Sequence, residues 1–94
     1  MTRDELLAKL REQKKWLAEQ GVDSVRVYGS FARDQAHEQS DVDLLVRLTK
    51  PLGLRFFSIE IELGERLGRV VEMTTEDDMH RLVRTRALAE AVLV

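Results

Sequence analysis

The chain has 94 residues, of which 44% are hydrophobic and 34% charged, and its formal net charge is −2. These values indicate one small globular domain, residues 1–94, and the absence of a basic excess argues against direct nucleic-acid binding. The sequence contains no cysteine, no apolar run near the ~18 residues that span a membrane and no signal peptide, which predicts a cytoplasmic protein without disulfides or membrane contact.

The first twenty residues have the pattern of an amphipathic helix. Thr2 followed three residues later by Glu5 is a capping-box signature, and Gly21 is typical of the residue that ends a helix. Between them, apolar residues recur at helical spacing: Leu6, Leu7, Leu10, Trp16 and Leu17.

The following segment predicts a strand, a tight turn and a short helix. Residues 24–28 alternate like a strand, Gly29-Ser30 forms the turn, and residues 30–34 are compatible with a helix. Glycine lets the backbone approach a ligand closely, and the first amides of a helix point outward toward anions. Ser30 is a suitable N-cap that also offers its hydroxyl to a phosphate. The stretch therefore predicts a phosphate-binding cradle, followed by a polar loop over residues 35–40.

Residues 41–48 predict a buried strand that begins with two acids. Side chains alternate along a strand, so Asp41 and Asp43 point to one face while Val42, Leu44 and Val46 point to the other. Two carboxylates side by side repel each other and are costly to desolvate. A divalent cation relieves both costs, and Mg²⁺ prefers such oxygen ligands. We therefore expect a magnesium site next to the cradle.

The second half of the chain predicts a helix, a strand and a final helix. After the break at residues 50–53, residues 54–67 read as a helix that ends at Gly68 and contains Gly64, which suggests close packing there. The expected inner face of this helix comprises Phe57, Ile61 and Leu67, broadened by Phe56 and Leu63.

A short β-branched strand is expected over residues 69–74. Residues 75–78 have a second capping-box pattern, which predicts a helix that runs through Leu82, Val83 and Leu88 to the C-terminus. The expected order is α-β-α-β-α-β-α, a small sheet covered by helices.

The central motif also carries a family resemblance. Residues 29–43 read GSFARDQAHEQSDVD, and this G-S-x10-D-x-D pattern resembles the signature of the nucleotidyltransferase superfamily that includes DNA polymerase beta. The surrounding GSFAR and SDVDLLV look most like the minimal nucleotidyltransferases (MNT), the antitoxins of HEPN/MNT toxin-antitoxin pairs. The resemblance implies an α/β (α+β) fold of the polymerase beta-like type, with helices packed on a small mixed sheet.

The resemblance further implies a set of site residues. A third carboxylate on the next strand joins the Asp pair in this superfamily, and Glu72 is the only acid in the expected third strand. Asp41, Asp43 and Glu72 are therefore the expected catalytic residues and Mg²⁺ ligands. Gly29, Ser30 and Arg33 are the expected nucleotide-binding residues.

Two positions depart from the family pattern. Glu72 stands where the family usually has the shorter aspartate, and metal geometry is sensitive to about half an ångström. Asp34 stands where glycine often follows GSFAR, and its charge would repel a triphosphate if it faced the site.

The function implied is that of a protein adenylyltransferase. Such an enzyme uses Mg²⁺ and transfers AMP from ATP to a hydroxyl, typically of a tyrosine, in the cognate HEPN toxin, which it thereby silences.

Two alternatives remain open. The first is a toxin-binding antitoxin module with weak or absent transferase activity, as the departures at Glu72 and Asp34 suggest. The second is a small-molecule nucleotidyltransferase, which is less favoured because those enzymes typically carry a second domain for the acceptor. Association into a homo-oligomer is also left open.

Overall fold

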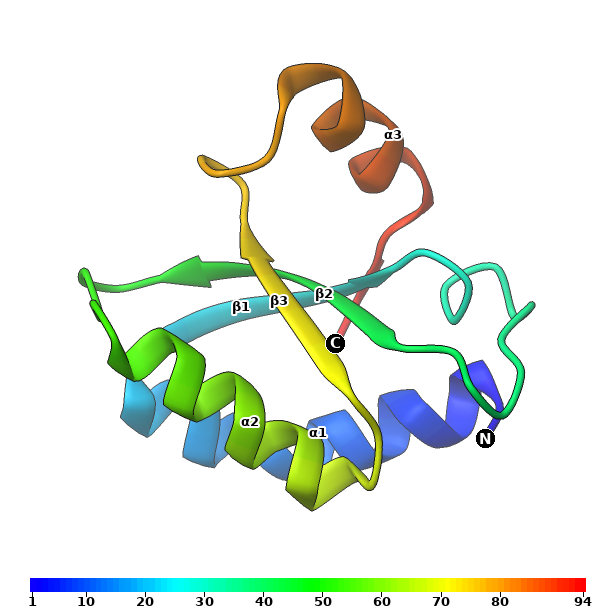
Figure 1. Ribbon diagram of the computed structural model, residues 1–94, viewed down its shortest axis with the longest axis horizontal. Coiled ribbons are helices and arrows are strands. Elements are labelled where there is room, and N and C mark those ends of the chain that lie inside the picture. The colour runs from blue at the N-terminus through cyan, green and yellow to red at the C-terminus, as the bar shows by residue number, and fades with distance from the viewer.

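The computed structural model describes all of residues 1–94. Three helices and four strands follow one another as α1, β1, β2, α2, β3, α3 and β4 (Figure 1). Their bounds are α1 Arg3–Gln20, β1 Val22–Tyr28, β2 Val42–Leu48, α2 Arg55–Leu67, β3 Val71–Thr75, α3 Arg81–Glu90 and β4 Val92–Leu93.

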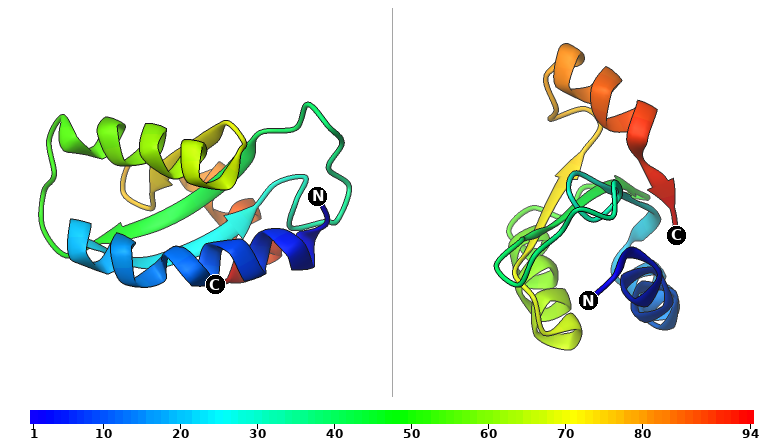
Figure 2. Two further views of the ribbon diagram at one scale, coloured as in Figure 1. Left: turned by 90° about the horizontal axis from the view of Figure 1, so that it is seen from below. Right: turned by 90° about the vertical axis from the view of Figure 1, so that its right-hand side faces the viewer.

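The strands form one mixed sheet with the spatial order β3-β2-β1-β4. β1 is antiparallel to both β2 and β4, whereas β2 and β3 run parallel. A parallel pair needs a crossover connection, and α2 provides it. α1 and α2 lie on one side of the sheet and α3 stands on the other (Figures 1 and 2). The predicted small mixed sheet covered by helices is confirmed.

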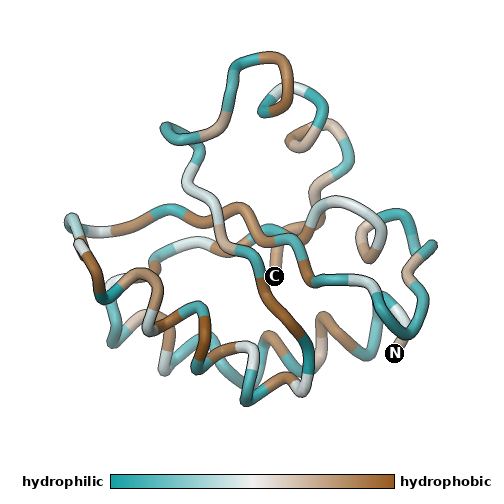
Figure 3. The backbone as a smooth tube through the Cα atoms, viewed as in Figure 1, coloured by the Kyte–Doolittle hydropathy of each residue, from teal (hydrophilic) through white to brown (hydrophobic).

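The alternation predicted for residues 41–48 divides β2 between the two faces. Val42, Leu44 and Val46 point toward α1 and α2, where a cluster of 17 buried residues forms the main core. We call this side of the sheet the core face. Asp43 and Leu45 point to the other side, which we call the open face, where a cluster of only three buried residues lies beneath α3. The brown stretches of Figure 3 mark the apolar residues along α1, α2 and β2.

Both predicted ends of α1 are confirmed. The Thr2 hydroxyl accepts a hydrogen bond from the Glu5 amide at 3.1 Å, and Gly21 ends the helix with a φ of 98°. A second hydrogen bond at this end of the helix runs from the Arg3 amide to the Asp34 carboxylate, at 3.1 Å. Asp34 thus serves the N-terminus of α1, where its negative charge is favourable.

The short helix expected over residues 30–34 is absent. The segment forms successive turns, with the Arg33 amide bonded to the Gly29 carbonyl and the Gln35 amide to the Ser30 carbonyl. Asp34 has a φ of 55°, a left-handed conformation that stops helix growth and that glycine adopts more readily than aspartate. Ser30 is therefore not a helix cap.

The expected inner face of α2 is partly correct, because Leu63 and Leu67 are buried as expected but Phe57 and Ile61 are not. Phe57 and Ile61 are 58% and 63% exposed, and the buried residues are Ile59, Leu63 and Leu67. Apolar residues occur on two sides of this helix, and packing against α1 and β3 selects one of them. The close packing suggested at Gly64 is present, because a Cβ there would lie 2.8 Å from the Arg69 carbonyl oxygen.

The C-terminal region also differs from the expectation. Thr75 and Asp78 form a turn in which the Thr75 hydroxyl accepts a hydrogen bond from the Asp78 amide at 3.3 Å and contacts its carboxylate at 2.8 Å. The helix begins only at Arg81, with His80 as its cap, and ends at Glu90. The last residues form β4, which the sequence analysis missed.

The large apolar residues of α3 lie at the protein surface. Leu82, Val83 and Leu88 are each more than 40% exposed, and Ala87 is the buried residue of this helix.

The outer edge of β3 carries one contact of note. The Glu60 carboxylate, on α2, accepts a hydrogen bond from the Met73 amide at 2.7 Å. None of the helices is both long and apolar enough to cross a lipid bilayer.

Candidate functional site

The three acids singled out from the sequence are neighbours on the open face. The parallel register of β2 and β3 places Asp43 directly beside Glu72, and Asp41 precedes β2 by one residue. Asp41 and Glu72 are exposed, whereas Asp43 is half-buried. The sheet register, which sequence spacing alone does not give, is what brings Glu72 to the aspartates.

The electrostatics of Asp43 reflect this crowding. The pKa of Asp43 is raised to about 6, most strongly by burial and then by the negative charges of Glu72 and Asp41. A divalent cation would relieve this repulsion, and carboxylate oxygens are the ligands that Mg²⁺ prefers. The donor chemistry therefore fits magnesium.

The three acids are neighbours rather than a preformed cage. No group of three or more acidic, histidine or cysteine side chains is already arranged to enclose a metal ion.

The Gly29 turn packs directly against the acids. Gly29 has a φ of 74°, and a Cβ at this position would overlap the Asp43 carboxylate. Both the conformation and the space require glycine. The turn backbone therefore lies close to the acidic pair, and its role as a phosphate-binding cradle stays a prediction.

Ser30 lies next to this contact and is partly exposed. Its carbonyl accepts the Gln35 amide at 2.8 Å, and its hydroxyl makes no hydrogen bond within the protein. The hydroxyl is thus free to contact a ligand, although no helix begins there.

An unexpected carboxylate, that of Glu90 on α3, binds the two donors assigned to the nucleotide. Glu90 Oε1 accepts the Gly29 amide at 2.9 Å, and Glu90 Oε2 accepts Arg33 Nη1 at 2.8 Å. Burial opposes ionisation, but the hydrogen bonds from Arg33 and Gly29 prevail and lower the pKa of Glu90. Arg33 also donates to Gln35 at 3.2 Å. No sequence signal pointed to Glu90, because 57 residues separate it from Arg33.

A cavity of about 390 Å³ lies between the turn and α3. Its lining residues come from the end of β1, the turn and one side of α3: Tyr28, Gly29, Arg33, Val83, Arg86, Ala87 and Glu90. Tyr28 pairs with Asp43 across the strands, so the cavity adjoins the acids.

Arg69 is a second residue that the sequence analysis missed. Its Nη1 donates to the carbonyls of His37 at 3.1 Å and Glu38 at 2.7 Å, and to Ser40 at 3.4 Å. Its guanidinium also lies over the Phe31 ring, 5.5 Å from the centroid. Arg69 thus fixes the loop that leads into Asp41.

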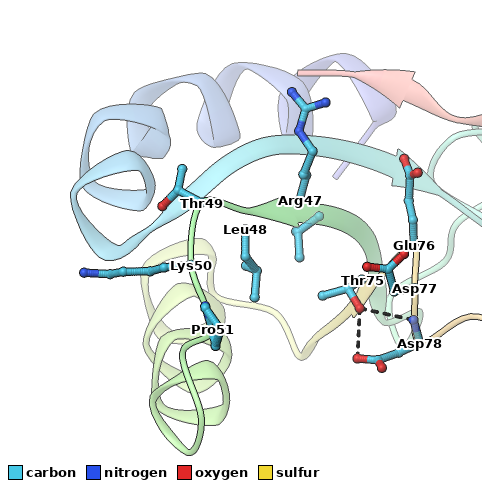
Figure 4. A pocket seen from close by; sticks show the side chains of 10 residues that line it. Arg47, Leu48, Thr49, Lys50, Pro51, Thr75, Glu76, Asp77 and Asp78 are labelled. Atoms are coloured by element: carbon cyan, nitrogen blue, oxygen red, sulfur yellow. Dashed lines mark hydrogen bonds between the residues drawn. The ribbon is translucent and has the colours of Figure 1, made fainter.

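Another cavity, of about 530 Å³, lies at the opposite end of β2 and β3 (Figure 4). Two of its three acids already have partners, because Glu76 pairs with Arg26 at 3.5 Å and Asp78 bonds to Thr75, whereas Asp77 is exposed without one. None of the acids of the motif lines this cavity.

Comparison with known proteins identifies the family of this chain. A family model described as a nucleotidyltransferase domain matches residues 6–94. A protein of Thermococcus cleftensis named protein adenylyltransferase MntA is 34% identical over 96 residues, which cover 100% of this chain and 97% of that protein.

Two solved structures share the fold. One described as a minimal nucleotidyltransferase superposes with a TM-score of 0.86 at 32% identity, covering 100% of this chain and 97% of that one. A chain from the crystal structure of a toxin-antitoxin with AMP-PNP superposes with a TM-score of 0.70 at 14% identity, covering 99% of this chain and 72% of that one. The second likeness concerns the fold alone.

Proposed function

Since this chain belongs to the nucleotidyltransferase domain family and is a nucleotidyltransferase, we propose that it transfers AMP from magnesium-bound ATP to a hydroxyl of a partner protein. The observation that supports this most is the packing of the Gly29 turn against Asp43, with Glu72 beside it on the sheet. The proposed phosphate-binding turn and the proposed metal ligands therefore lie side by side at the same end of β2 and β3.

The residues divide into two groups by chemistry. Asp41, Asp43 and Glu72 would hold Mg²⁺, which when bound neutralises phosphate charge. The Gly29 amide, the Ser30 hydroxyl and Arg33 would orient the triphosphate by hydrogen bonds and charge. Orientation and charge neutralisation supply most of the catalysis in phosphoryl and nucleotidyl transfer.

Glu72 is suited to accept the proton of the attacking hydroxyl. It is exposed at the rim of the site, next to the half-buried Asp43. As the bond between the acceptor oxygen and the α-phosphorus forms, the bond to pyrophosphate breaks and the hydroxyl proton passes to the carboxylate. The products are the AMP ester of the acceptor and pyrophosphate.

The acceptor is proposed to be a tyrosine of a cognate HEPN toxin. Asp41 and Glu72 lie at the surface, where a side chain of a second protein can reach them. The relative named protein adenylyltransferase MntA and the toxin-antitoxin structure of the same fold support a protein acceptor of this kind.

A second candidate is an antitoxin that neutralises its toxin by contact with weak or no transfer. Two observations favour it: the acids are not a preformed metal cage, and Glu90 occupies the donors of Gly29 and Arg33.

Transfer from ATP labelled at the α-phosphate separates the two candidates. The purified protein, Mg²⁺ and a lysate of its own host are incubated, with the Asp41→Asn/Asp43→Asn variant alongside. We expect a labelled protein band with the wild type and at least a hundredfold less label with the variant. Equal label in both would overturn the site assignment. No label, with the same partner captured by both proteins, would establish the contact mechanism instead.

A further inference from the structure

The contact made by Glu90 has the form of an anion-binding site that is already filled. Its two oxygens lie 2.9 Å from the Gly29 amide nitrogen and 2.8 Å from Arg33 Nη1. A main-chain amide of a turn and a guanidinium are the donors that bind phosphate oxygens elsewhere in proteins. One anion cannot use them while another does.

We propose that the Glu90 carboxylate takes the place of a nucleotide phosphate group in the free protein, and that the incoming triphosphate displaces it from Gly29 and Arg33. The inference deepens the proposed function and rests on it. It adds that nucleotide binding and the position of α3 are coupled.

The charges around the site make this exchange favourable for binding. Glu90 adds a fourth carboxylate to Asp41, Asp43 and Glu72, all of which oppose a triphosphate. Arg86 lies one helical turn before Glu90, lines the same cavity and makes no ion pair. When the Glu90 carboxylate is displaced, the Arg33 guanidinium becomes available to bind phosphate. Arg86 lines the same cavity and can add a second positive charge.

The attachment of α3 is weak enough for such a movement. Only Ala87 of this helix is buried, together with Leu45 and Met79, while Leu82 and Val83 are 64% and 51% exposed. The main core on the opposite face does not involve α3 (Figure 2). Releasing Glu90 therefore changes the last turn of α3 without disturbing the core.

A positioning role for Glu90 gives the opposite expectation. If the carboxylate remained bound and held Arg33 toward the phosphates, its removal would weaken nucleotide binding. The sign of the affinity change therefore separates displacement from positioning.

Calorimetric titration with two probes tests the proposal: inorganic tripolyphosphate and a non-hydrolysable ATP analogue, each with Mg²⁺. The proteins are the wild type, Glu90→Gln and Glu62→Gln. The last is a matched control, because Glu62 also pairs with an arginine, Arg66 at 2.9 Å, but on α2. We expect Glu90→Gln to bind both probes about three- to tenfold more tightly than the wild type, and Glu62→Gln to bind them equally.

Hydrogen exchange supplies a readout that affinity does not. Addition of tripolyphosphate to the wild type should speed amide exchange over residues 81–90, and Glu90→Gln should show that faster exchange without ligand. Unchanged exchange on binding would overturn the proposal even if Glu90→Gln alters the stability of α3.

The remaining outcomes are also decisive. Equal or weaker binding by Glu90→Gln would overturn displacement alone and leave the transferase proposal standing. Tighter binding without any AMP transfer would sink the transferase proposal and keep displacement. Failure of all three proteins to bind either probe would overturn both.

Discussion

The two faces of the sheet differ in how much they bury and in what they carry. The core face meets α1 and α2 over a cluster of 17 buried residues. The open face meets only α3, over a cluster of three, and carries Asp43, Glu72 and the cavity beside the Gly29 turn. Alternation along the same strand supplies both faces, since Leu44 faces the core while Asp43 does not.

The difference shows how a chain of 94 residues combines stability with an exposed acidic site. Burial on one face stabilises the fold, so the other can hold like charges that oppose it. Substitutions on the core face should therefore affect stability most, and those on the open face should affect binding and pH dependence.

The largest expected loss of stability comes from Leu63→Ala on the core face. Leu63 is fully buried, and truncation of a buried leucine costs about 2–5 kcal/mol of unfolding free energy. The matched change Leu82→Ala, on the exposed side of α3, should cost about 0.5 kcal/mol or less. Urea unfolding of both variants measures this contrast, and similar losses would refute the assignment of the two faces.

Gly29→Ala should damage both stability and binding. The added Cβ meets the Asp43 carboxylate, and the left-handed φ of 74° costs further energy, together about 2 kcal/mol. Gly53→Ala is a suitable control, since its φ is also positive at 58° but a Cβ there meets nothing within 4 Å. Thermal unfolding and Mg-ATP titration should show that only Gly29→Ala loses nucleotide binding.

Arg69→Met tests whether the acidic site depends on a residue that is not itself part of the site. The change removes the hydrogen bonds to the His37, Glu38 and Ser40 carbonyls, so the unfolding free energy should fall by about 1–2 kcal/mol. We also expect the loop before Asp41 to loosen and AMP transfer to fall about tenfold. Arg55→Met, which loses one exposed bond to Gln20, is the control. Unchanged transfer would show that Asp41 does not depend on this loop.

The smallest effect expected is a gain of stability from Asp43→Asn. The pKa of Asp43 is raised to about 6, so the folded state binds its proton more tightly than the unfolded state does. Ionisation at neutral pH therefore destabilises the fold, and the variant should gain about 1 kcal/mol at pH 7.5 after allowance for solvent screening.

The gain should shrink as the pH falls through 6 and vanish only below the ordinary carboxyl pKa of 3.8, by about pH 3, where both states are protonated. A gain that persists undiminished at about pH 3, below the pKa of Asp43 in both states, would contradict the electrostatic cause.

Much of the fold could be predicted from local signals. Thr2 and Gly21 bound α1 as expected, Gly68 ends α2, and the alternation around Val42 and Leu44 identifies β2 and its two faces. Each of these depends on a residue's own conformation or on the period of its neighbours.

The errors arose where tertiary packing decides between alternatives. α2 has apolar residues on two sides, and only contact with the sheet selects Leu63 over Ile61. The Thr75 pattern suits a cap or a turn equally. β4 has two residues, too few for a period, and exists because its backbone pairs with β1.

The candidate site divides in the same way. The motif identifies Gly29, Ser30 and the aspartates, because their chemistry depends on spacing along the chain. The placement of Glu72 beside Asp43 depends on sheet register, and Glu90 and Arg69 reach the site from distant segments. Their roles stay predictions for the experiments above.

The hydrogen bond from the Met73 amide to Glu60 has a consequence for assembly. β3 is one of the two outer strands, and an unpaired amide on such a strand favours pairing with a strand of another chain. Here the Glu60 carboxylate already accepts a hydrogen bond from the Met73 amide at 2.7 Å. Backbone pairing with another chain is thereby disfavoured at this position of β3, so a partner that approaches this edge meets side chains there.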